Sequence, residues 1–270
     1  MQKKVILITG ASSGMGKITA KDLIKQGHIV YCAARHIEKM QDLEEAGGHL
    51  LSVDVTKDDD LQKAVETIIN EHERIDILWN NAGFGLYGPV EEIPLEKARN
   101  QFETNLFGLA RLTQMVTPHM RNKQKGLIIN TSSMGGKIYT PLGAWYHASK
   151  HAVEGFSDCL RIELKSFGIN VVILEPGLID THFYNEVENN VPETTIKGPY
   201  KNTLNGLTNG SLSKAKRSPA KVISKTITKI INKKNPKPRY TAGNMAKSLI
   251  FIRKFLGDRF FDKIMINSLK

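Results

Sequence analysis

Short runs of β-branched and aliphatic residues alternate with longer stretches of helical period along most of the chain. The strand-like runs cover residues 5–8, 29–33, 50–53, 75–79, 127–130 and 170–174. Between them, apolar residues recur at helical spacing over residues 14–27, 37–46, 57–73, 95–121 and 144–167. Strands that alternate with helices form a parallel sheet, and strands without polar alternation need helices on both faces. The pattern therefore predicts an α/β, doubly wound fold with right-handed crossovers.

The last third of the chain departs from this alternation of strands and helices. Residues 180–218 are irregular and rich in Asn, Thr, Gly and Lys, which indicates a mobile lid with one or two short helices over a substrate site. A helix follows over residues 219–232, with Pro219 in its first turn, and a seventh strand over 238–242. Residues 244–270 form a basic amphipathic tail, helical over 245–269. A chain of this length fits one domain over residues 1–270.

The positive net charge comes from the C-terminal part of the chain. Residues 197–270 carry 18 Lys or Arg against two Asp or Glu, whereas residues 1–196 carry 20 against 25. A basic groove through the body is therefore excluded, and no nucleic-acid partner is expected. The basic end has two readings: it contacts an acidic partner or membrane surface, or it is a solvated face that aids solubility.

The first apolar run and the cysteines indicate the cellular compartment in which the protein is expected. The first apolar run, residues 5–8, is too short for the core of a signal peptide. The chain has two cysteines, Cys32 and Cys159, both in apolar patterns that predict burial, so no disulfide framework is expected. These features favour the reducing cytoplasm, and nothing in the motifs calls for a metal.

A glycine-rich turn follows the first strand and opens the first helix. Residues 9–16 read TGASSGMG. Gly10 permits a sharp turn, Gly14 lets the backbone approach a pyrophosphate, and Gly16 lets the helix pack close to the sheet. Free amides at the start of the helix can then hold the anion. The turn therefore predicts a dinucleotide site.

Tyr146 and Lys150 lie four residues apart, and so on one face of the predicted helix. A phenol with its ordinary pKa near 10 is a poor base at neutral pH, and a fixed ammonium group stabilises its phenolate. Ser133 follows the strand-like run 127–130, where loops at the carboxyl ends of parallel strands build active sites. Its hydroxyl can hydrogen-bond a carbonyl oxygen as negative charge develops there. Position after the strand does not separate Ser133 from Ser132.

Taken together, these motifs resemble those of the short-chain dehydrogenase/reductase family, in its single-domain branch. The match covers roughly the first 185 residues in the right order: TGxxxGxG at 9–16, NNAG at 80–83, the spacing of Ser133 to Tyr146, and YxxxK at 146–150. The resemblance implies a Rossmann-like, mainly seven-stranded parallel sheet. It also implies a catalytic set of Asn105, Ser133, Tyr146 and Lys150, in which the backbone of Asn105 binds a water that links Lys150 to solvent. The choice of Ser133 is implied by the family resemblance through its spacing to Tyr146, which leaves Ser132 as a structural turn residue.

The same resemblance implies which residues hold the cofactor. Asp54 would accept a hydrogen bond from the adenine amine, and the segment 176–181 would hold the nicotinamide carboxamide. The full set expected to bind the cofactor is Gly10, Ser12, Ser13, Gly14, Met15, Gly16, Arg35, Asp54, Val55, Asn81, Ala82, Gly83, Tyr146, Lys150, Pro176, Gly177, Ile179 and Thr181.

The end of the second strand predicts which nicotinamide cofactor is preferred. Ala34 stands where an NAD-preferring relative would carry an acid that grips the ribose 2′-hydroxyl. Arg35 can instead pair with the 2′-phosphate of NADP, with Ser13 as a helper. NADP(H) is therefore predicted, and NAD(H) stays an alternative if Arg35 only stacks on the adenine.

Aromatic and apolar residues next to the motifs indicate a lipophilic ketone or alcohol substrate, as in steroid and retinol dehydrogenase-like members. They are Phe84, Leu86, Tyr87, Met134, Tyr139, Trp145, Phe183 and Tyr184. The reaction expected is the interconversion of a carbonyl and an alcohol by hydride transfer. Two alternatives stay open: an epimerase or dehydratase on a related fold, and a non-catalytic NADP(H)-binding protein that docks on membranes.

The resemblance also implies a homodimer or homotetramer built on the helices that contain Asn105 and Tyr146. The tail over 245–269 mixes apolar and basic residues, so it could lie on an acidic membrane surface. Equally, it could cover the substrate cleft or form a subunit contact.

Overall fold

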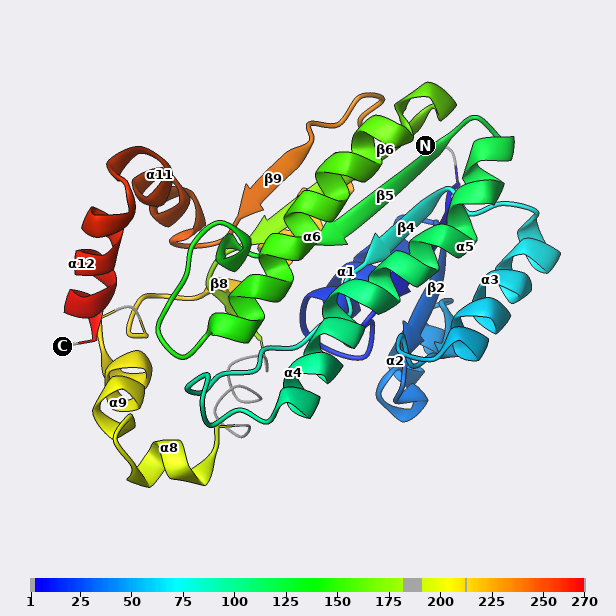
Figure 1. Cartoon of the computed structure of the whole chain (residues 1–270). Helices are drawn as coiled ribbons and strands as arrows, with labels where there is room; N and C mark the ends of the chain where they lie inside the picture. The colour runs from blue at the N-terminus through cyan, green and yellow to red at the C-terminus, as the bar shows by residue number, and fades with distance from the viewer. Residues whose placement is uncertain (1–2, 182–190, 212, 270) are drawn as a thin grey trace.

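The computed structural model describes residues 3–181, 191–211 and 213–269 (Figure 1). Within them, seven parallel strands form one sheet in the order β3-β2-β1-β4-β5-β6-β9. Their bounds are β1 Val5–Thr9, β2 Ile29–Ala34, β3 His49–Ser52, β4 Ile77–Asn80, β5 Gly126–Thr131, β6 Ile169–Pro176 and β9 Arg239–Ala242. The predicted doubly wound, seven-stranded parallel sheet is confirmed.

Helices cover both faces of the sheet, which is why its strands need no polar alternation. Their bounds are α1 Gly14–Lys25, α2 Gln41–Glu45, α3 Asp58–His72, α4 Leu95–Phe102, α5 Gly108–Asn122, α6 Ala144–Glu163, α8 Glu193–Lys197, α9 Lys201–Asn209, α10 Lys221–Ile231, α11 Ala246–Leu256 and α12 Asp258–Ser268. Successive residues of β1 point to opposite layers: Ile6 and Ile8 pack with α1 and α10, and Val5 and Leu7 pack with α3 and α5. Figure 1 shows α5 and α6 in front of the sheet.

Three sequence predictions need correction. Residues 95–121 are not one regular helix, because a π-helical turn, η2 (Glu103–Phe107), separates α4 from α5. Pro219 does not start a helix; it belongs to β8 (Ser218–Pro219), which pairs with β7 (Ile179–Asp180) in a small second sheet. Cys159 is exposed, since it lies on the outer side of α6, although Cys32 is buried.

The C-terminal tail is two helices and not one. Gly257 stands between α11 and α12 with a φ of 75°, a backbone conformation that only glycine adopts without strain. The two helices pack on the segment after β5 through Phe261, which contacts Tyr139 edge to face at 5.1 Å between ring centroids. Leu249 and Ile138 complete this apolar cluster. The tail thus lies at the end of the sheet where β9 points to α11 (Figure 1).

Short helices α8 and α9 lie in the segment predicted to be a lid, but residues 182–190 and 212 are outside the described part of the chain. That this segment opens and closes over a substrate stays a prediction. No helix in the described residues is both long and apolar enough to cross a bilayer.

We predict that Phe261 anchors the tail energetically. Phe261→Ala should lower the free energy of unfolding by about 3 kcal/mol, because it empties a fully buried site between α12 and Tyr139. The neighbouring Phe260→Ala, at a side chain that is 48% exposed, should change it by less than about 0.5 kcal/mol. Urea denaturation of both variants checks this, and equal losses would show that the tail is not held through Phe261.

Candidate active site

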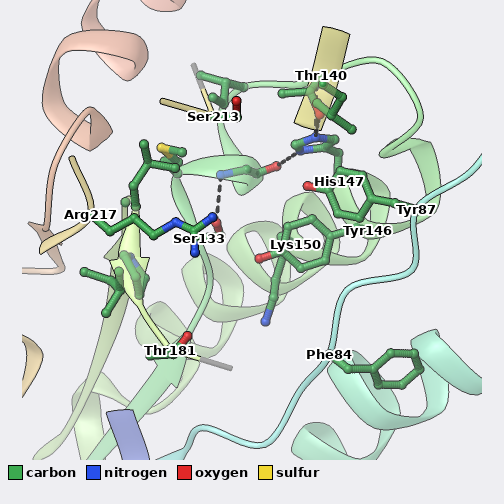
Figure 2. Close-up of a pocket in the computed structure, with 18 of the residues that line it drawn as sticks. Phe84, Tyr87, Ser133, Thr140, Tyr146, His147, Lys150, Thr181, Ser213 and Arg217 are labelled. Atoms are coloured by element: carbon green, nitrogen blue, oxygen red, sulfur yellow. Dashed lines mark hydrogen bonds between the residues drawn. The ribbon is translucent and has the colours of Figure 1, made fainter. Parts of the chain in front are cut away.

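A cavity of about 580 Å³ opens at the carboxyl edge of the sheet, where a doubly wound fold binds its ligands (Figure 2). Motif residues and apolar residues from other segments line it. The motif residues are Met15, Asn81, Gly83, Ser133, Tyr146, Lys150, Pro176, Gly177, Ile179 and Thr181. The apolar walls include Phe84, Tyr87, Met134, Ile138, Leu178, Val191, Ile196, Leu204, Leu207 and Leu249. We call this space the main cavity.

Tyr146 and Lys150 lie on the inner face of α6 and both line the main cavity. The Lys150 side chain is almost fully buried, and its Nζ donates a hydrogen bond of 2.9 Å to the carbonyl of Thr131, at the end of β5. Burial lowers the pKa of Lys150 to about 8, against a smaller opposing effect of the Glu154 carboxylate. The ammonium form of Lys150 therefore still predominates at neutral pH. It lines the same cavity as the phenol of Tyr146, whose phenolate a cation would stabilise.

Ser133 begins the short helix η3 (Met134–Gly136) and faces the main cavity. Its Oγ accepts a hydrogen bond of 3.0 Å from the amide of Gly135, which orients the hydroxyl. A hydroxyl that accepts from the protein keeps its own proton for a ligand oxygen. Ser132 is buried and directs its Oγ toward the Lys150 carbonyl at 3.4 Å, as a structural residue would.

His147 fixes this loop, and sequence reasoning did not find it. Its Nδ1 donates to the carbonyl of Gly135 at 2.9 Å, and its Nε2 accepts from the amide of Thr140 at 3.0 Å (Figure 2). These partners require the neutral tautomer, and burial lowers the pKa of His147 to about 4. The residue after the tyrosine therefore holds the backbone that carries Ser133. A histidine beside YxxxK was visible in the sequence, but its partners come from the loop it faces.

Asn105 lies in the π turn between α4 and α5 and does not line the main cavity. Its Oδ1 accepts from the amide of Phe84 and its Nδ2 donates to the Phe84 carbonyl and to Ser149 Oγ, each at 3.0 Å. A Cβ added to Gly83 would lie 3.0 Å from Asn105 Oδ1 and 3.5 Å from Lys150 Nζ. Asn105 thus stands behind Gly83, in reach of the lysine, and fixes the loop after β4. π turns in helices often mark functional sites.

The glycine-rich turn is packed too tightly for side chains. A Cβ on Gly10 would lie 2.9 Å from Ala82 Cα, and one on Gly16 would lie 2.2 Å from the Gly10 carbonyl oxygen. Asn81 donates to the carbonyls of Thr9 and Gly10, and the Thr9 hydroxyl accepts from two amides of the loop after β4. The role of Thr9 in joining both loops was not predicted.

The turn fits a bound pyrophosphate. Helix α1 has no acidic residue in its first turn and no side chain that caps its amides, so the helix start can receive an external anion. Gly14, with φ of 51°, would place a Cβ 3.3 Å from the Thr181 methyl group, so that space is open only because the residue is glycine. Ser12, Ser13 and Arg35 line a second cavity beside the turn, together with Lys17 and other residues of the segment after β2.

Among the predicted cofactor residues, Asp54, Val55, Gly10, Gly14, Gly16 and Ala82 line neither cavity in the described structure. Asp54 Oδ1 accepts hydrogen bonds from the amide and hydroxyl of Thr56, at 3.0 and 2.8 Å. The Val55 carbonyl abuts Gly108 at the start of α5, where a Cβ would come within 2.3 Å of it. Asp54 is therefore held by its side chain and Val55 packs against α5 through its carbonyl, and their contact with a cofactor stays a prediction.

The structure divides the predicted substrate-contacting residues. Phe84, Tyr87 and Met134 line the main cavity, whereas Leu86 and Trp145 pack in a separate apolar cluster and Tyr139 packs on the tail. Phe183 and Tyr184 lie outside the described residues. Arg217 and several residues of α9 line the cavity as well and were not predicted.

Comparison with known proteins gives a consistent picture. The family model described as short chain dehydrogenase matches residues 4–192. A 3-ketodihydrosphingosine reductase of Bacteroides thetaiotaomicron is 46% identical over 184 residues, which cover 68% of this chain and 66% of that protein. An NADPH-dependent 3-dehydrocapnine reductase of Ornithobacterium rhinotracheale is 32% identical over 281 aligned positions, which cover 98% of this chain and 96% of that protein.

One solved structure has a similar fold over most of its own length. Serine dehydrogenase complexed with NADP⁺ superposes with a TM-score of 0.77 and 27% identity, covering 88% of this chain and 94% of that one. Sheet order, motif spacing, family match and this likeness point to the same assignment. The chain belongs to the short-chain dehydrogenase family and is an oxidoreductase that acts on alcohols or carbonyl compounds with a nicotinamide dinucleotide.

Proposed function

We propose that the protein is an NADP(H)-dependent reductase of a lipophilic carbonyl compound, which it converts to the alcohol. The observation that carries this is one cavity in which Ser133, Tyr146 and Lys150 meet walls that are mostly apolar. One ketone, one NADPH and one proton give one alcohol and one NADP⁺. The reverse oxidation uses the same groups.

In this proposal the chain handles the oxygen and the proton. When bound, the nicotinamide supplies the hydride for the carbonyl carbon. Ser133 donates a hydrogen bond to the carbonyl oxygen, and Tyr146 gives that oxygen its proton. Lys150 stabilises the resulting phenolate with its buried ammonium group, 2.9 Å from the Thr131 carbonyl. Asn105 keeps the loop after β4 against this lysine, and its backbone is proposed to hold the water that returns a proton from solvent.

Two features support a preference for NADP(H). Arg35, Ser12 and Ser13 line the second cavity beside the glycine-rich turn, where the adenosine end would lie. Glu38, Asp42 and Glu45 line it as well, and Asp42 is paired with Lys17 and Lys21. No carboxylate stands at the position of Ala34 to compete with a phosphate. The relative from Ornithobacterium is named as NADPH-dependent. Gly10, Gly14, Gly16, Met15, Asn81, Ala82, Gly83, Asp54, Val55, Pro176, Gly177, Ile179 and Thr181 complete the proposed cofactor site.

Tyr146→Phe tests the mechanism. The phenyl ring keeps the packing but has no proton to give, so kcat with NADPH should fall at least about a hundredfold. The Kd for NADPH should change by less than about twofold. NADPH oxidation is measured with the best substrate from a panel of aldehydes, ketones, quinones, steroids and retinoids. Tyr240→Phe, on β9 away from the main cavity, is the matched control, and near-native turnover by Tyr146→Phe would reject the mechanism.

Arg35→Leu tests the cofactor preference. Loss of a charge-assisted contact to the 2′-phosphate should raise the Kd for NADPH about tenfold or more. The Kd for NADH should change little, because NADH lacks that phosphate. Fluorescence titration with both cofactors measures this, with the exposed Arg99→Leu of α4 as the control. Tighter binding of NADH than NADPH by the unchanged protein would refute the preference.

We also propose that the protein is a cytoplasmic homo-oligomer that contacts membranes peripherally. Both cysteines are free thiols, as in a reducing compartment. Phe107 and Ile162, near and on the helices expected at a subunit contact, are exposed. We call the exposed face of α11 and α12 the tail surface, defined by Phe251, Phe255, Leu256, Phe260, Lys247, Lys254, Arg259 and Lys263. None of its four cations has a carboxylate partner among the described residues.

The membrane proposal predicts selective flotation. The protein should float with vesicles that contain phosphatidylglycerol and stay behind with pure phosphatidylcholine, since the tail surface joins exposed aromatic rings to unpaired cations. The double variant Phe251→Ser, Phe255→Ser should lose most of this binding. Val90→Ser, at a similarly exposed position in the segment after β4, is the control and should bind normally. No flotation of the unchanged protein would end the proposal.

A further inference from the structure

Glu154 lies on the same face of α6 as the proposed catalytic pair, one turn beyond Lys150. Tyr146, Lys150 and Glu154 follow one another at four-residue spacing, and all three are buried. Glu154 is not among the described residues that line the main cavity or the second cavity. Burial of a carboxylate costs free energy, and the reaction proposed above gives this one no role.

One oxygen of the Glu154 carboxylate joins two other segments of the chain to α6. Oε2 lies 2.9 Å from Lys137 Nζ and accepts a hydrogen bond of 3.0 Å from Arg239 Nε, at the start of β9. Lys137 directly follows η3, the short helix that Ser133 begins, and its amide donates to the Met134 carbonyl at 2.9 Å. The contact with Lys137 therefore holds the end of the Ser133 loop against α6.

Gly136 marks how closely this loop packs on α6. A Cβ added to Gly136 would lie 2.9 Å from the Lys150 carbonyl oxygen and 3.0 Å from Glu154 Cγ. The loop backbone thus rests directly on the turn of α6 that carries both residues. A change in the position of the Glu154 carboxylate is therefore transmitted to the backbone that presents Ser133.

The charge of the Glu154 carboxylate also acts on Lys150. Burial lowers the pKa of Lys150 to about 8, and the negative charge of Glu154 opposes that shift. The second carboxylate oxygen, Oε1, is buried and accepts no hydrogen bond from the described residues. Its negative charge is therefore not screened by a direct donor, and it acts on Lys150 through a medium of low dielectric constant.

The other charged groups around Glu154 come from the end of η3 and from α6, β6 and β9. They are Lys137, Asp158, Arg161, Glu175 and Arg239. Arg239 forms ion pairs with three carboxylates of the group, and burial raises the pKa of Glu175, with a further contribution from Glu154. Lys150 forms no ion pair within the described part of the chain, so its charge depends on the Thr131 carbonyl and on Glu154.

We propose that Glu154 is a positioning residue for the reduction. Through Lys137 it holds the loop that carries Ser133, and through its charge it keeps Lys150 in the ammonium form. This inference rests on the proposed reductase function, because Ser133 and Lys150 act on a substrate only in that reaction. Tyr146, Lys150 and Glu154 then form one buried row on α6, whose third member touches no ligand.

The pH dependence of kcat tests the effect on Lys150, with NADPH and the best ketone of the panel. Glu154→Gln removes a negative charge, so Lys150 should lose its proton more readily and activity should be lost on the alkaline side at a pH lower by roughly half a unit or more. Glu154→Asp keeps the charge and should restore the pH limit of the unchanged protein. Glu163→Gln, at the exposed end of α6, is the matched control and should leave that limit in place.

Lys137→Met separates the contact with the loop from the effect on Lys150. The variant keeps the carboxylate but frees the loop, so kcat should fall about tenfold as Ser133 loses its fixed position. The pH limit should not move to a lower value, because removal of a cation does not favour deprotonation of Lys150. Amide hydrogen exchange of residues 133–137, measured without substrate, should become faster in Lys137→Met. The Lys137 side chain is 34% exposed, so its replacement is expected to leave the fold intact.

Separate outcomes decide the inference and the function on which it rests. An unchanged pH limit in Glu154→Gln, even with a lower melting temperature, overturns the inference and makes the residue purely structural. If Glu154→Gln does not fold, Lys137→Met decides alone, and kcat and hydrogen exchange equal to those of the unchanged protein overturn the inference. If hydrogen exchange responds as expected but the unchanged protein reduces no ketone with NADPH, the contact with the loop stands and the proposed reductase function fails.

Discussion

The proposed active site depends on keeping the buried Lys150 ammonium group charged. Burial of a charge costs several kcal/mol unless polar partners surround it, and here the cost appears as a pKa lowered to about 8. The polar group that partly offsets this cost is the Thr131 carbonyl at the end of β5, which accepts a hydrogen bond from Lys150 Nζ. Thr131 is itself fixed, because Trp79 of β4 donates to its hydroxyl at 2.9 Å. A buried tryptophan, two central strands and the catalytic helix thus converge on one nitrogen atom.

The same convergence explains why the loops around the site have so little freedom. A side chain at Gly83 would be crowded, because its Cβ would lie 3.0 Å from Asn105 Oδ1 and 3.5 Å from Lys150 Nζ. Asn105 bonds the backbone of Phe84 from within the π turn that separates α4 from α5. On the other side, His147 is locked as a neutral ring by the loop that carries Ser133. The loops that carry Gly83 and Ser133 are therefore both held by side chains from neighbouring helices.

The parts of this arrangement that were predictable from sequence are the local ones. The glycine-rich turn and the Tyr146–Lys150 pair need only a strand, a turn and one helical face, so their spacing is written in consecutive residues. The strands were predictable because buried parallel strands are continuous apolar runs. The π turn was not, since residues 95–121 keep helical apolar spacing through it. The break at Gly257 was missed for a similar reason, because the apolar residues on either side continue one pattern.

The walls of the cavity lay beyond sequence reasoning because they come from segments that meet only in three dimensions. Leu249 of α11 and Arg217 before β8 both line the main cavity, yet neither is near a motif. What brings them there is β9, the last strand, which sets α11 beside the sheet edge, and Asn244 just after it, which ties down the backbone around Arg217. The motif residues thus come from the first part of the fold, and the C-terminal part adds further walls to the same cavity. The sequence already distinguishes these two parts by charge. Residues 197–270 hold 18 Lys or Arg but only two Asp or Glu.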